Sequence, residues 1–423
     1  MNITNGQTTV FSLNSDGEGI AFDDEGKNIH IPFVLPGEKV KFECHTFKKK
    51  KKYWAVEHLT ANNDRVEPVC KHFMQCGGCM LQHMSPSMYR EFKQAQITNA
   101  LNKHGLDPYV VDGITVLPFG KRRRANLDAI RKENDIFLGF HRFRSHQIIN
   151  VFECHTMDPA LTRLLAPLRE ALLVVLEPFQ KAKLFFTLSH VGVDVSLEVQ
   201  GIATLDEEKR GILKLFAESM DVARFTFRYR KTHDVIYQRA NPVVQFSGID
   251  VAVDAYSFLQ ATIEADQHLA DYVLAELLPD AAHIADLFCG RGTLSLPLAT
   301  RAPVFGYEFD RAALGALQTA SANAEHSIHL HLRDLFANPL TRDELSRFDV
   351  LVIDPPRAGA EAQSNLMATT NAKQIMYVSC NPETFARDAR ILTDGNFKIK
   401  KVHGIDQFAW SPHIEVVGVF EQK

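Results

Sequence analysis

One pattern recurs through the last third of the chain: a short apolar run ends in a polar residue or a tight turn, and a stretch suited to a helix follows. Strands and helices that alternate in this way predict an open parallel sheet with helices on both faces. Ligands bind such sheets at the carboxyl ends of the strands. We therefore expect one crevice to collect the residues at or just after the predicted strand ends, namely Phe288, Glu308, Asp334, Asp354 and Cys380.

The first of these strands, His283–Phe288, leads into a glycine turn, Cys289–Thr293. A helix over Leu294–Thr300 and a second strand over Val304–Glu308 follow. An acid at the end of the second strand is placed to bind a ribose hydroxyl. Ser295 stands where a dinucleotide fingerprint has its third glycine, which argues against NAD or FAD. The pattern fits a ligand with one ribose and no pyrophosphate, such as S-adenosylmethionine.

Cys380 lies between a predicted strand end, Tyr377–Ser379, and a predicted helix start. Asn381 is a good N-cap residue, and Pro382 suits the first helical position. A thiol ahead of a helix N-terminus experiences the positive end of the helix dipole, so we expect a lowered pKa, with Arg387 adding to the effect. An isolated cysteine is more often a buried structural thiol. The acids that precede Cys380 favour a nucleophile instead.

Four further cysteines form a possible metal site: Cys70, Cys76 and Cys79 lie close together, and Cys154 lies far downstream. Four thiolates hold zinc or an iron–sulfur cluster, and the spacing does not separate the two. The seven cysteines are not spaced as disulfide pairs, which is typical of a cytoplasmic protein with a metal site.

Several motifs resemble those of the RNA (uracil-5-)-methyltransferases: Asp286–Gly290, Asp354–Arg357, Ser379–Pro382 and Arg387–Asp388. The segment from Cys70 to Gln82 resembles the iron–sulfur segment of the bacterial 23S rRNA branch, and the opening residues resemble a TRAM domain. The resemblance implies a 4Fe-4S cluster on the four cysteines, Cys380 as nucleophile and Glu415 as base. It also implies S-adenosyl-L-methionine ligands at Gln260, Phe288, Thr293, Glu308, Asp334 and Asp354. The chain departs from the family at Trp410–Pro412, where proline-x-threonine is more usual.

Glu415 is also singled out by its position, because it is an acid that enters the apolar run ending at Val417. Burial there is expected to raise its pKa towards that of a usable base. An exposed strand glutamate is the plainer alternative. Methylation at carbon-5 of uracil needs one thiolate and one base, and Cys380 and Glu415 would supply them.

Length and charge predict two or three domains with RNA as the partner. We expect a TRAM-like OB β-barrel over residues 1–61 and a central α+β iron–sulfur domain over 62–250. A Rossmann-like methyltransferase domain is expected over 251–423, with a helix near 88–118 packed on it. The net charge is −4, but basic residues cluster at Lys48–Lys52, Lys121–Arg124 and Arg142–His146, where we expect phosphate contacts. No membrane span or secretory signal is evident, so we expect a cytoplasmic monomer.

The main alternatives concern the substrate and the reaction. The same chemistry on tRNA is the nearest one, although the TRAM-like opening and the cysteine cluster favour 23S rRNA. A non-catalytic RNA-binding or redox-sensing protein would have no use for Cys380 and Glu415 together. An amino-group methyltransferase would need an aromatic residue after Pro356, where Arg357 stands.

Overall fold

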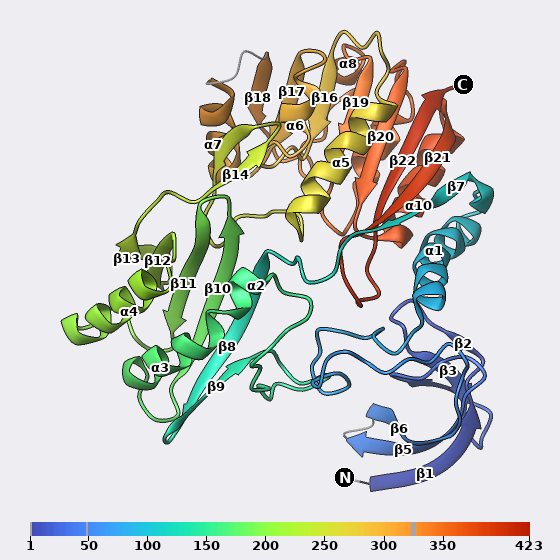
Figure 1. Ribbon diagram of the computed structural model, residues 1–423. Coiled ribbons are helices and arrows are strands. Elements are labelled where there is room, and N and C mark those ends of the chain that lie inside the picture. The colour runs from blue at the N-terminus through green and yellow to red at the C-terminus, as the bar shows by residue number, and fades with distance from the viewer. Residues whose placement is uncertain (1, 48–49, 323–326) are drawn as a thin grey trace. The chain divides into compact units, whose positions relative to one another are not determined.

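A computed structural model describes residues 2–47, 50–322 and 327–423 of the chain (Figure 1). The chain divides into two compact units. The small unit contains Met1–Gln96, His141–Gln147 and Phe408–His413, and the large unit contains the remaining three segments, Ile97–Phe140, Ile148–Gln407 and Ile414–Lys423. Within the described residues, no helix combines the length and the apolar character needed to cross a membrane.

The small unit contains two antiparallel three-stranded sheets. The first pairs β1 (Asn2–Thr9), β5 (Lys39–Phe47) and β6 (Lys50–Thr60), and the second pairs β2 (Ser12–Leu13), β3 (Gly19–Phe22) and β4 (Asn28–Ile31). Side chains from both sheets form one apolar cluster, which includes Ala21, Ile31 and Val40. The short strands and turns expected from the sequence are therefore present, while the boundary predicted near residue 61 stays a prediction.

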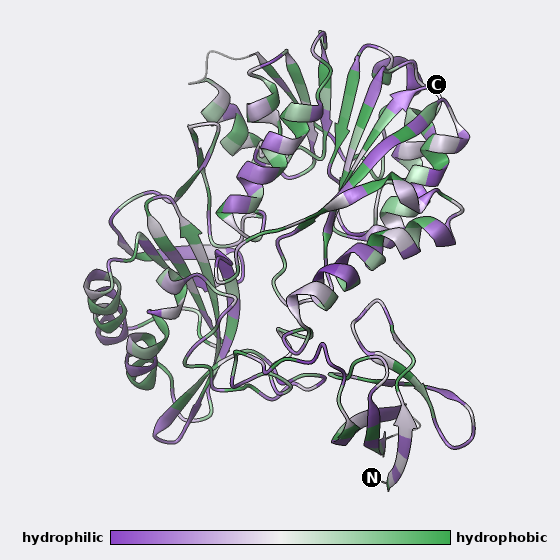
Figure 2. Cartoon of the chain, turned by 45° about the vertical axis from the view of Figure 1, so that its right-hand side comes forward, coloured by the Kyte–Doolittle hydropathy of each residue, from purple (hydrophilic) through white to green (hydrophobic). Residues whose placement is uncertain are grey.

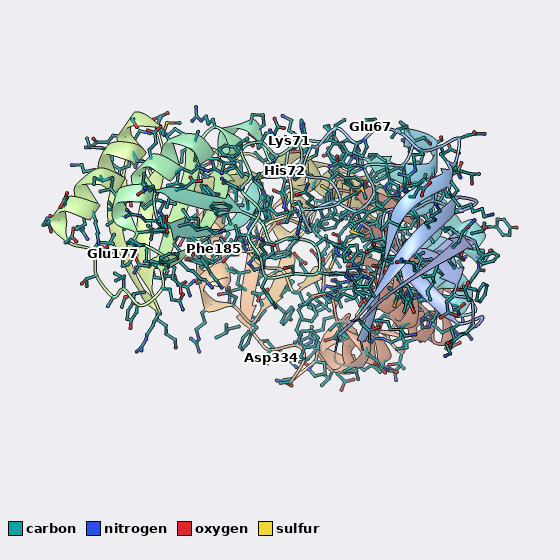
Figure 3. All side chains as sticks on the ribbon, turned by 90° about the horizontal axis from the view of Figure 1, so that it is seen from below. Glu67, Lys71, His72, Glu177, Phe185 and Asp334 are labelled. Carbon is teal, nitrogen blue, oxygen red and sulfur yellow. The ribbon has the colours of Figure 1, made fainter. Side chains whose placement is uncertain are left out.

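The first part of the large unit is a six-stranded sheet in the order β13-β12-β11-β10-β8-β9. Helices α3 (Leu165–Val175) and α4 (Glu207–Ser219) pack on one face of it through residues such as Leu168 and Phe216. Phe185, labelled in Figure 3, lies on the other face, where its ring packs against Tyr256 with centroids 4.5 Å apart. The strands are β8 (Arg124–Lys132), β9 (Asp135–Gly139), β10 (Lys181–Ser189), β11 (Gly192–Val199), β12 (Arg224–Tyr229) and β13 (Thr232–Gln238).

The second part of the large unit is an eight-stranded sheet in the order β18-β17-β16-β19-β20-β22-β21-β7. β22 runs antiparallel to its neighbours β20 and β21, and the other pairs are parallel. Residues in β16, β19 and β20 are buried throughout, which agrees with the hydrophobic colouring of the central strands in Figure 2. The strands are β7 (Val111–Val116), β16 (Ile284–Leu287), β17 (Val304–Glu308), β18 (Ile328–Leu332), β19 (Val350–Ile353), β20 (Gln374–Ser379), β21 (Phe397–Asp406) and β22 (Glu415–Gln422).

Helices cover both faces of this sheet. Side chains of α5 (Ile263–Glu276) and α6 (Ser295–Leu298) belong to the cluster on one face, and α5 is seen in front of the strands in Figure 1. The opposite cluster takes side chains from α9 (Glu361–Met367) and α10 (Pro382–Asp394), and from the C-terminal half of α1 (Pro86–Lys103). The remaining elements are η1 (Pro108–Val110), α2 (Pro159–Thr162), β14 (Val243–Phe246), β15 (Ile249–Ala252), α7 (Arg311–Ala322) and α8 (Arg342–Leu345).

Candidate active site

Parallel pairing aligns the strand ends that the sequence singles out. Leu287 pairs with both Tyr307 and Ile353, so the chain leaves β16, β17 and β19 at the same level. The next residues along β16 and β19, Phe288 and Asp354, therefore lie at the carboxyl edge of the sheet together with Glu308. This is the edge at which open α/β sheets bind ligands.

The antiparallel strand β22 brings the second half of the site to the same edge. Ser379 of β20 pairs with Val416 of β22, so the register one step further sets Cys380 opposite Glu415. Asn381 accepts the backbone N–H of Glu383 at 3.1 Å and caps α10, whose first residue is Pro382. The predicted cap is confirmed. Residues 35 positions apart thus meet because one strand returns antiparallel beside the other.

The electrostatic environment of Cys380 differs from the one that we expected. Burial and the nearby carboxyl groups of Glu415 and Asp354 raise the pKa of the Cys380 thiol to about 11, although Arg357 acts in the opposite direction. The expectation of a lowered pKa is wrong, because desolvation and two carboxyl groups outweigh the end of a helix dipole. The helping cation is also Arg357 rather than Arg387, whose guanidinium binds Asp388, with Nε to Oδ1 at 2.7 Å.

Glu415 has the properties expected of a base. It is 3% exposed. Burial and the charge of Asp354 raise its pKa to about 8, and a hydrogen bond from Gln407 lowers it in part. Burial likewise raises the pKa of Asp354 to about 7. Both carboxyl groups therefore exchange protons near neutral pH, which is the range in which a general base operates.

Gln260 lies far from Glu415 in sequence, but one amide joins them. Gln407 follows β21, and its Nε2 donates to Gln260 Oε1 at 2.6 Å and to Glu415 Oε2 at 2.8 Å. The carbonyl oxygen of Gln260 accepts from Arg123 Nε at 3.0 Å. Gln407 therefore joins Gln260 and Glu415 in one buried network, of which the sequence indicated these two members and missed Gln407.

The glycine turn after β16 is shaped by close contacts. A Cβ on Gly292 would lie 2.5 Å from Leu317, and the φ of Gly292 is +95°, so glycine is required there. The carboxylate of Glu308 accepts Gly290 N at 2.9 Å, and both Phe309 N and Asp310 N at 2.7 Å. These bonds hold the acid beside the turn.

The other predicted cofactor residues flank this turn. Thr293 is half-buried directly after Gly292. Phe288 has a φ of +63°, and its ring lies 5.3 Å from that of Phe336. Asp334, labelled in Figure 3, follows β18, and its Oδ1 accepts the backbone N–H of Phe336 at 3.0 Å. Their roles as ligands stay predictions.

Asp286 is a further acid of this region that the sequence reading did not single out as a site residue. It is fully buried, and burial raises its pKa to about 7. Ser295 Oγ donates to its Oδ2 at 2.5 Å, while Oδ1 has no hydrogen-bond partner among the described residues. Ser295, which replaces the third glycine, therefore donates a hydrogen bond to a buried acid. This pairing of Asp286 with Ser295 could not be predicted from either residue alone.

The sequence profile of the tRNA (uracil-5-)-methyltransferase family matches residues 121–423. The chain belongs to this family. It is 38% identical to an uncharacterised RNA methyltransferase of Agrobacterium fabrum, over 98% of this chain and 99% of the relative. It is 31% identical to the 23S rRNA (uracil(1939)-C(5))-methyltransferase RlmD of Mannheimia succiniciproducens, over 99% of this chain and 96% of the relative. The resemblance seen in the motifs is thereby confirmed.

A solved structure shares the fold. The tRNA (uracil-54, C5)-methyltransferase of Pyrococcus abyssi, in complex with S-adenosyl-L-homocysteine, superimposes with a TM-score of 0.75 at 22% identity. The match covers 98% of this chain and 100% of the other. The mixed α/β architecture of the family thus extends through the chain.

The four predicted metal ligands of this family member are distributed over both units of the chain. Cys70, Cys76 and Cys79 belong to the small unit, and Cys154 belongs to the large unit. The sulfur of Cys76 accepts Gly78 N at 3.4 Å, and that of Cys154 lies 3.1 Å from Thr156 Oγ1. Across the described ranges, no group of three or more His, Cys, Asp or Glu side chains is assembled to hold a metal. The donor chemistry suits a cluster, but an assembled site is not shown.

The predicted basic clusters divide into exposed and buried residues. Lys48 and Lys49 lie outside the described residues. Lys121 and Arg122 are exposed, but Arg123 is 1% exposed and forms a 2.6 Å ion pair with Asp266. The expectation that Arg123 contacts phosphate is therefore wrong. A run of basic letters cannot reveal which side chain turns inward towards a partner more than a hundred residues away.

The third basic cluster also makes structural contacts within the small unit. Arg144 forms an ion pair with Glu18, and its guanidinium lies 5.1 Å from the centre of the Phe143 ring. The Phe143 ring packs edge-on against Phe33 and Trp54. Phe143 is thus engaged by protein side chains on two sides, which reduces its capacity to stack on a base.

Proposed function

We propose that the chain transfers a methyl group from S-adenosylmethionine to carbon-5 of a uridine in RNA, with Cys380 as nucleophile and Glu415 as proton acceptor. The observation that supports this most directly is the register of β20 and β22, which sets the thiol opposite the buried carboxyl group. The raised pKa of Glu415, about 8, suits a group that must take up a proton near neutral pH.

The protein must make carbon-5 of uracil nucleophilic and later remove its proton. The Cys380 thiolate adds to carbon-6, which opens the C5–C6 double bond and leaves carbon-5 enolate-like. S-adenosylmethionine supplies the electrophilic methyl group that carbon-5 takes. The Glu415 carboxylate then removes the carbon-5 proton, and the electron pair of that bond restores the double bond as the Cys380 sulfur leaves carbon-6.

The cofactor is assigned to the carboxyl edge of the eight-stranded sheet. Glu308 suits a ribose hydroxyl, because its carboxylate stands at the end of β17 beside the glycine turn. Phe288 offers an aromatic surface to the same region. The full proposed set is Gln260, Phe288, Thr293, Glu308, Asp334 and Asp354.

The RNA substrate that we propose is 23S rRNA, modified in the cytoplasm. The similarity over nearly the whole length to a relative named as a 23S rRNA methyltransferase supports this target. A TRAM-like RNA-binding role for the N-terminal strands and phosphate contacts at Lys121 and Arg122 are consistent with it. tRNA is the second candidate, because the fold matches that of an enzyme named for tRNA.

We further propose that Cys70, Cys76, Cys79 and Cys154 bind a 4Fe-4S cluster, since four cysteine thiolates are the ligand set that iron–sulfur clusters take. Protein purified without oxygen should be brown and contain iron and sulfide. Stoichiometric zinc without iron under the same conditions would contradict the assignment.

The catalytic proposal is tested with RNA fragments that carry 5-fluorouridine. Fluorine replaces the proton that must leave, so the methylated adduct cannot collapse and should appear as a slow band on a denaturing gel. Cys380→Ala should abolish the band and the transfer of label from radioactive cofactor. A band that persists in Cys380→Ala would show that another residue is the nucleophile. Fragments of 23S rRNA and tRNA, offered separately, distinguish the two substrates.

A further inference from the structure

Gln407 is a buried glutamine that joins three parts of the large unit. It directly follows β21 and is 5% exposed. Its Oε1 accepts the backbone N–H of Ala261 at 2.6 Å, while its Nε2 donates to the side chains of Gln260 and Glu415. Both N–H groups of the amide and one of the two lone pairs of Oε1 therefore take part in hydrogen bonds.

The orientation of this amide is determined by its partners. A backbone N–H can only donate, so the atom that faces Ala261 must be the oxygen of the amide. The nitrogen then faces Gln260 and Glu415, with one N–H for each. In a flipped amide, the NH2 group of Gln407 would face the backbone N–H of Ala261, so that two donors would face each other. The amide oxygen would then face the carboxyl group of Glu415, and the flip is therefore strongly disfavoured.

The segment that orients Gln407 is itself anchored. Arg123 donates from its backbone N–H to Ala261 O at 2.9 Å and from Nε to Gln260 O at 3.0 Å. The same guanidinium pairs with the buried Asp266 of α5. Because Thr262 caps α5 through Ala265 N at 3.0 Å, the backbone of this segment is held from both sides. The amide of Gln407 therefore meets a rigid surface.

We infer that Gln407 is a positioning residue for the proposed base: it holds Oε2 of Glu415 in place, favours the carboxylate form and couples the base to Gln260. The inference rests on the proposed function of Glu415. The hydrogen bond occupies Oε2, so the other carboxyl oxygen is assigned to receive the proton from carbon-5. Burial and Asp354 raise the pKa of Glu415 and the Gln407 bond lowers it, so loss of the amide should make the base harder to ionise.

The test compares Gln407→Met, which keeps the length of the side chain without the amide, with Gln363→Met. Gln363 is a matched control, because it is 1% exposed and its amide bonds only with the backbone of Leu340 among the partners described. Gln407→Met should slow turnover near pH 7 by about 10- to 100-fold, which is the loss that removal of an outer-shell partner causes at metal sites. It should also accumulate a covalent adduct with ordinary uridine RNA.

The pH profile separates positioning from general loss of structure. In Gln407→Met the acidic limb of the kcat profile should move to higher pH, and activity should recover in part above that limb. Gln363→Met should keep the profile of the original protein even if its thermal stability falls. An unshifted profile in Gln407→Met would overturn the inference.

Two further variants complete the design. If Gln407→Met does not fold, Gln407→Glu retains an acceptor for Ala261 and sets a second acid against Glu415, so its acidic limb should also move to higher pH. An unmoved limb there would likewise overturn the inference. Glu415→Gln is measured in parallel: if it turns over normally, the proposed function fails, whereas if it stalls while Gln407→Met behaves like Gln363→Met, only the role of Gln407 is wrong.

Discussion

Glu38 in the small unit and Glu415 in the large unit are both withdrawn from solvent, at 0% and 3% exposed. Burial opposes ionisation of Glu38, but Arg65, His58 and two backbone N–H groups outweigh it and hold the pKa of that carboxyl well below its usual range. For Glu415, burial and Asp354 prevail over the Gln407 bond, and the pKa rises to about 8.

The difference shows that burial alone does not decide what a carboxyl group does. Glu38 Oε1 and Oε2 accept Arg65 Nε at 2.5 Å and Nη2 at 2.7 Å, and Leu35 N donates at 2.8 Å. This carboxylate is permanently charged and structural. Glu415 receives one amide and faces an acid, so its two protonation states differ little in free energy near neutral pH, as a proton acceptor requires.

The strongest test of this contrast removes the charge at each site in turn. Glu415→Gln should lower turnover by about 10²- to 10⁴-fold, because general base catalysis contributes that much, and should accumulate a covalent adduct with unmodified uridine. Glu38→Gln should leave turnover per folded molecule unchanged. Rates from radioactive cofactor and denaturing gels measure both outcomes. Normal turnover in Glu415→Gln would show that Glu415, like Glu38, is not needed for the reaction.

The converse effect is expected on stability. Glu38→Gln leaves the Arg65 guanidinium without its carboxylate and should destabilise the small unit by about 3 kcal/mol, the lower end of the range for breaking a buried pair, since Arg65 is partly exposed. Glu415→Gln should cost little or should stabilise. Urea unfolding followed by fluorescence of Trp54 and Trp410, the two tryptophans, which both lie in the small unit, compares the variants. Equal midpoints for Glu38→Gln and the original protein would contradict the structural role.

The two glutamates should also respond to pH in opposite directions. The lowered pKa of Glu38 gives stability that is present above about pH 4.5 and is lost as the pH falls below that value. The raised pKa of Glu415 gives a contribution that is present below about pH 4.5 and is lost as the pH rises through about 8. In calorimetry from pH 4 to 9, the melting temperature of Glu415→Gln should rise relative to that of the original protein at the alkaline end, by roughly 1–2 °C for each kcal/mol in a unit of this size. If the melting temperatures of the two proteins change in parallel with pH, the raised pKa of Glu415 is refuted.

The smallest expected effect concerns the thiol. Because the charge of Glu415 raises the pKa of Cys380, Glu415→Gln should lower that pKa and speed alkylation by iodoacetamide near pH 8. Glu38→Gln should leave the alkylation rate unchanged. Mass spectrometry of the peptide that contains Cys380 gives the rates, and slower alkylation in Glu415→Gln would show that the two groups do not interact as the structure indicates.

Local patterns predicted much of the sheet. The run Val304–Glu308 corresponds residue for residue to β17, and the cap at Asn381 and Pro382 begins α10 as expected. Such features depend on neighbours in sequence: apolar continuity, a capping side chain and a restricted φ. The helix expected over Leu294–Thr300 is shorter, Ser295–Leu298, because its ends depend on packing.

Features that depend on distant partners were missed or misjudged. The helix expected near 88–118 ends at Lys103, and the strand β7 follows within that range. The expectation is wrong there because β7 is the edge strand of the eight-stranded sheet, and its pairing partner β21 lies almost three hundred residues later. The central α+β domain was expected over 62–250 without its strand order, and residues 160–245 form most of the six-stranded sheet and its helices. Arg123 was grouped with exposed bases although Asp266 holds it inside.

The sequence by itself determined the type of chemistry: a thiol at a strand end ahead of a capped helix, a late acid in an apolar strand and a glycine turn followed by an acid. These signals are local, and residue type and spacing carry them. The tertiary structure alone decided the proton affinities and the alignment. The antiparallel return of β22 sets Glu415 opposite Cys380, burial and neighbouring carboxyl groups raise the pKa values of both, and the amide of Gln407 bonds to the proposed base. Solvation and Coulomb energies depend on distances in space, which no interval along the chain specifies.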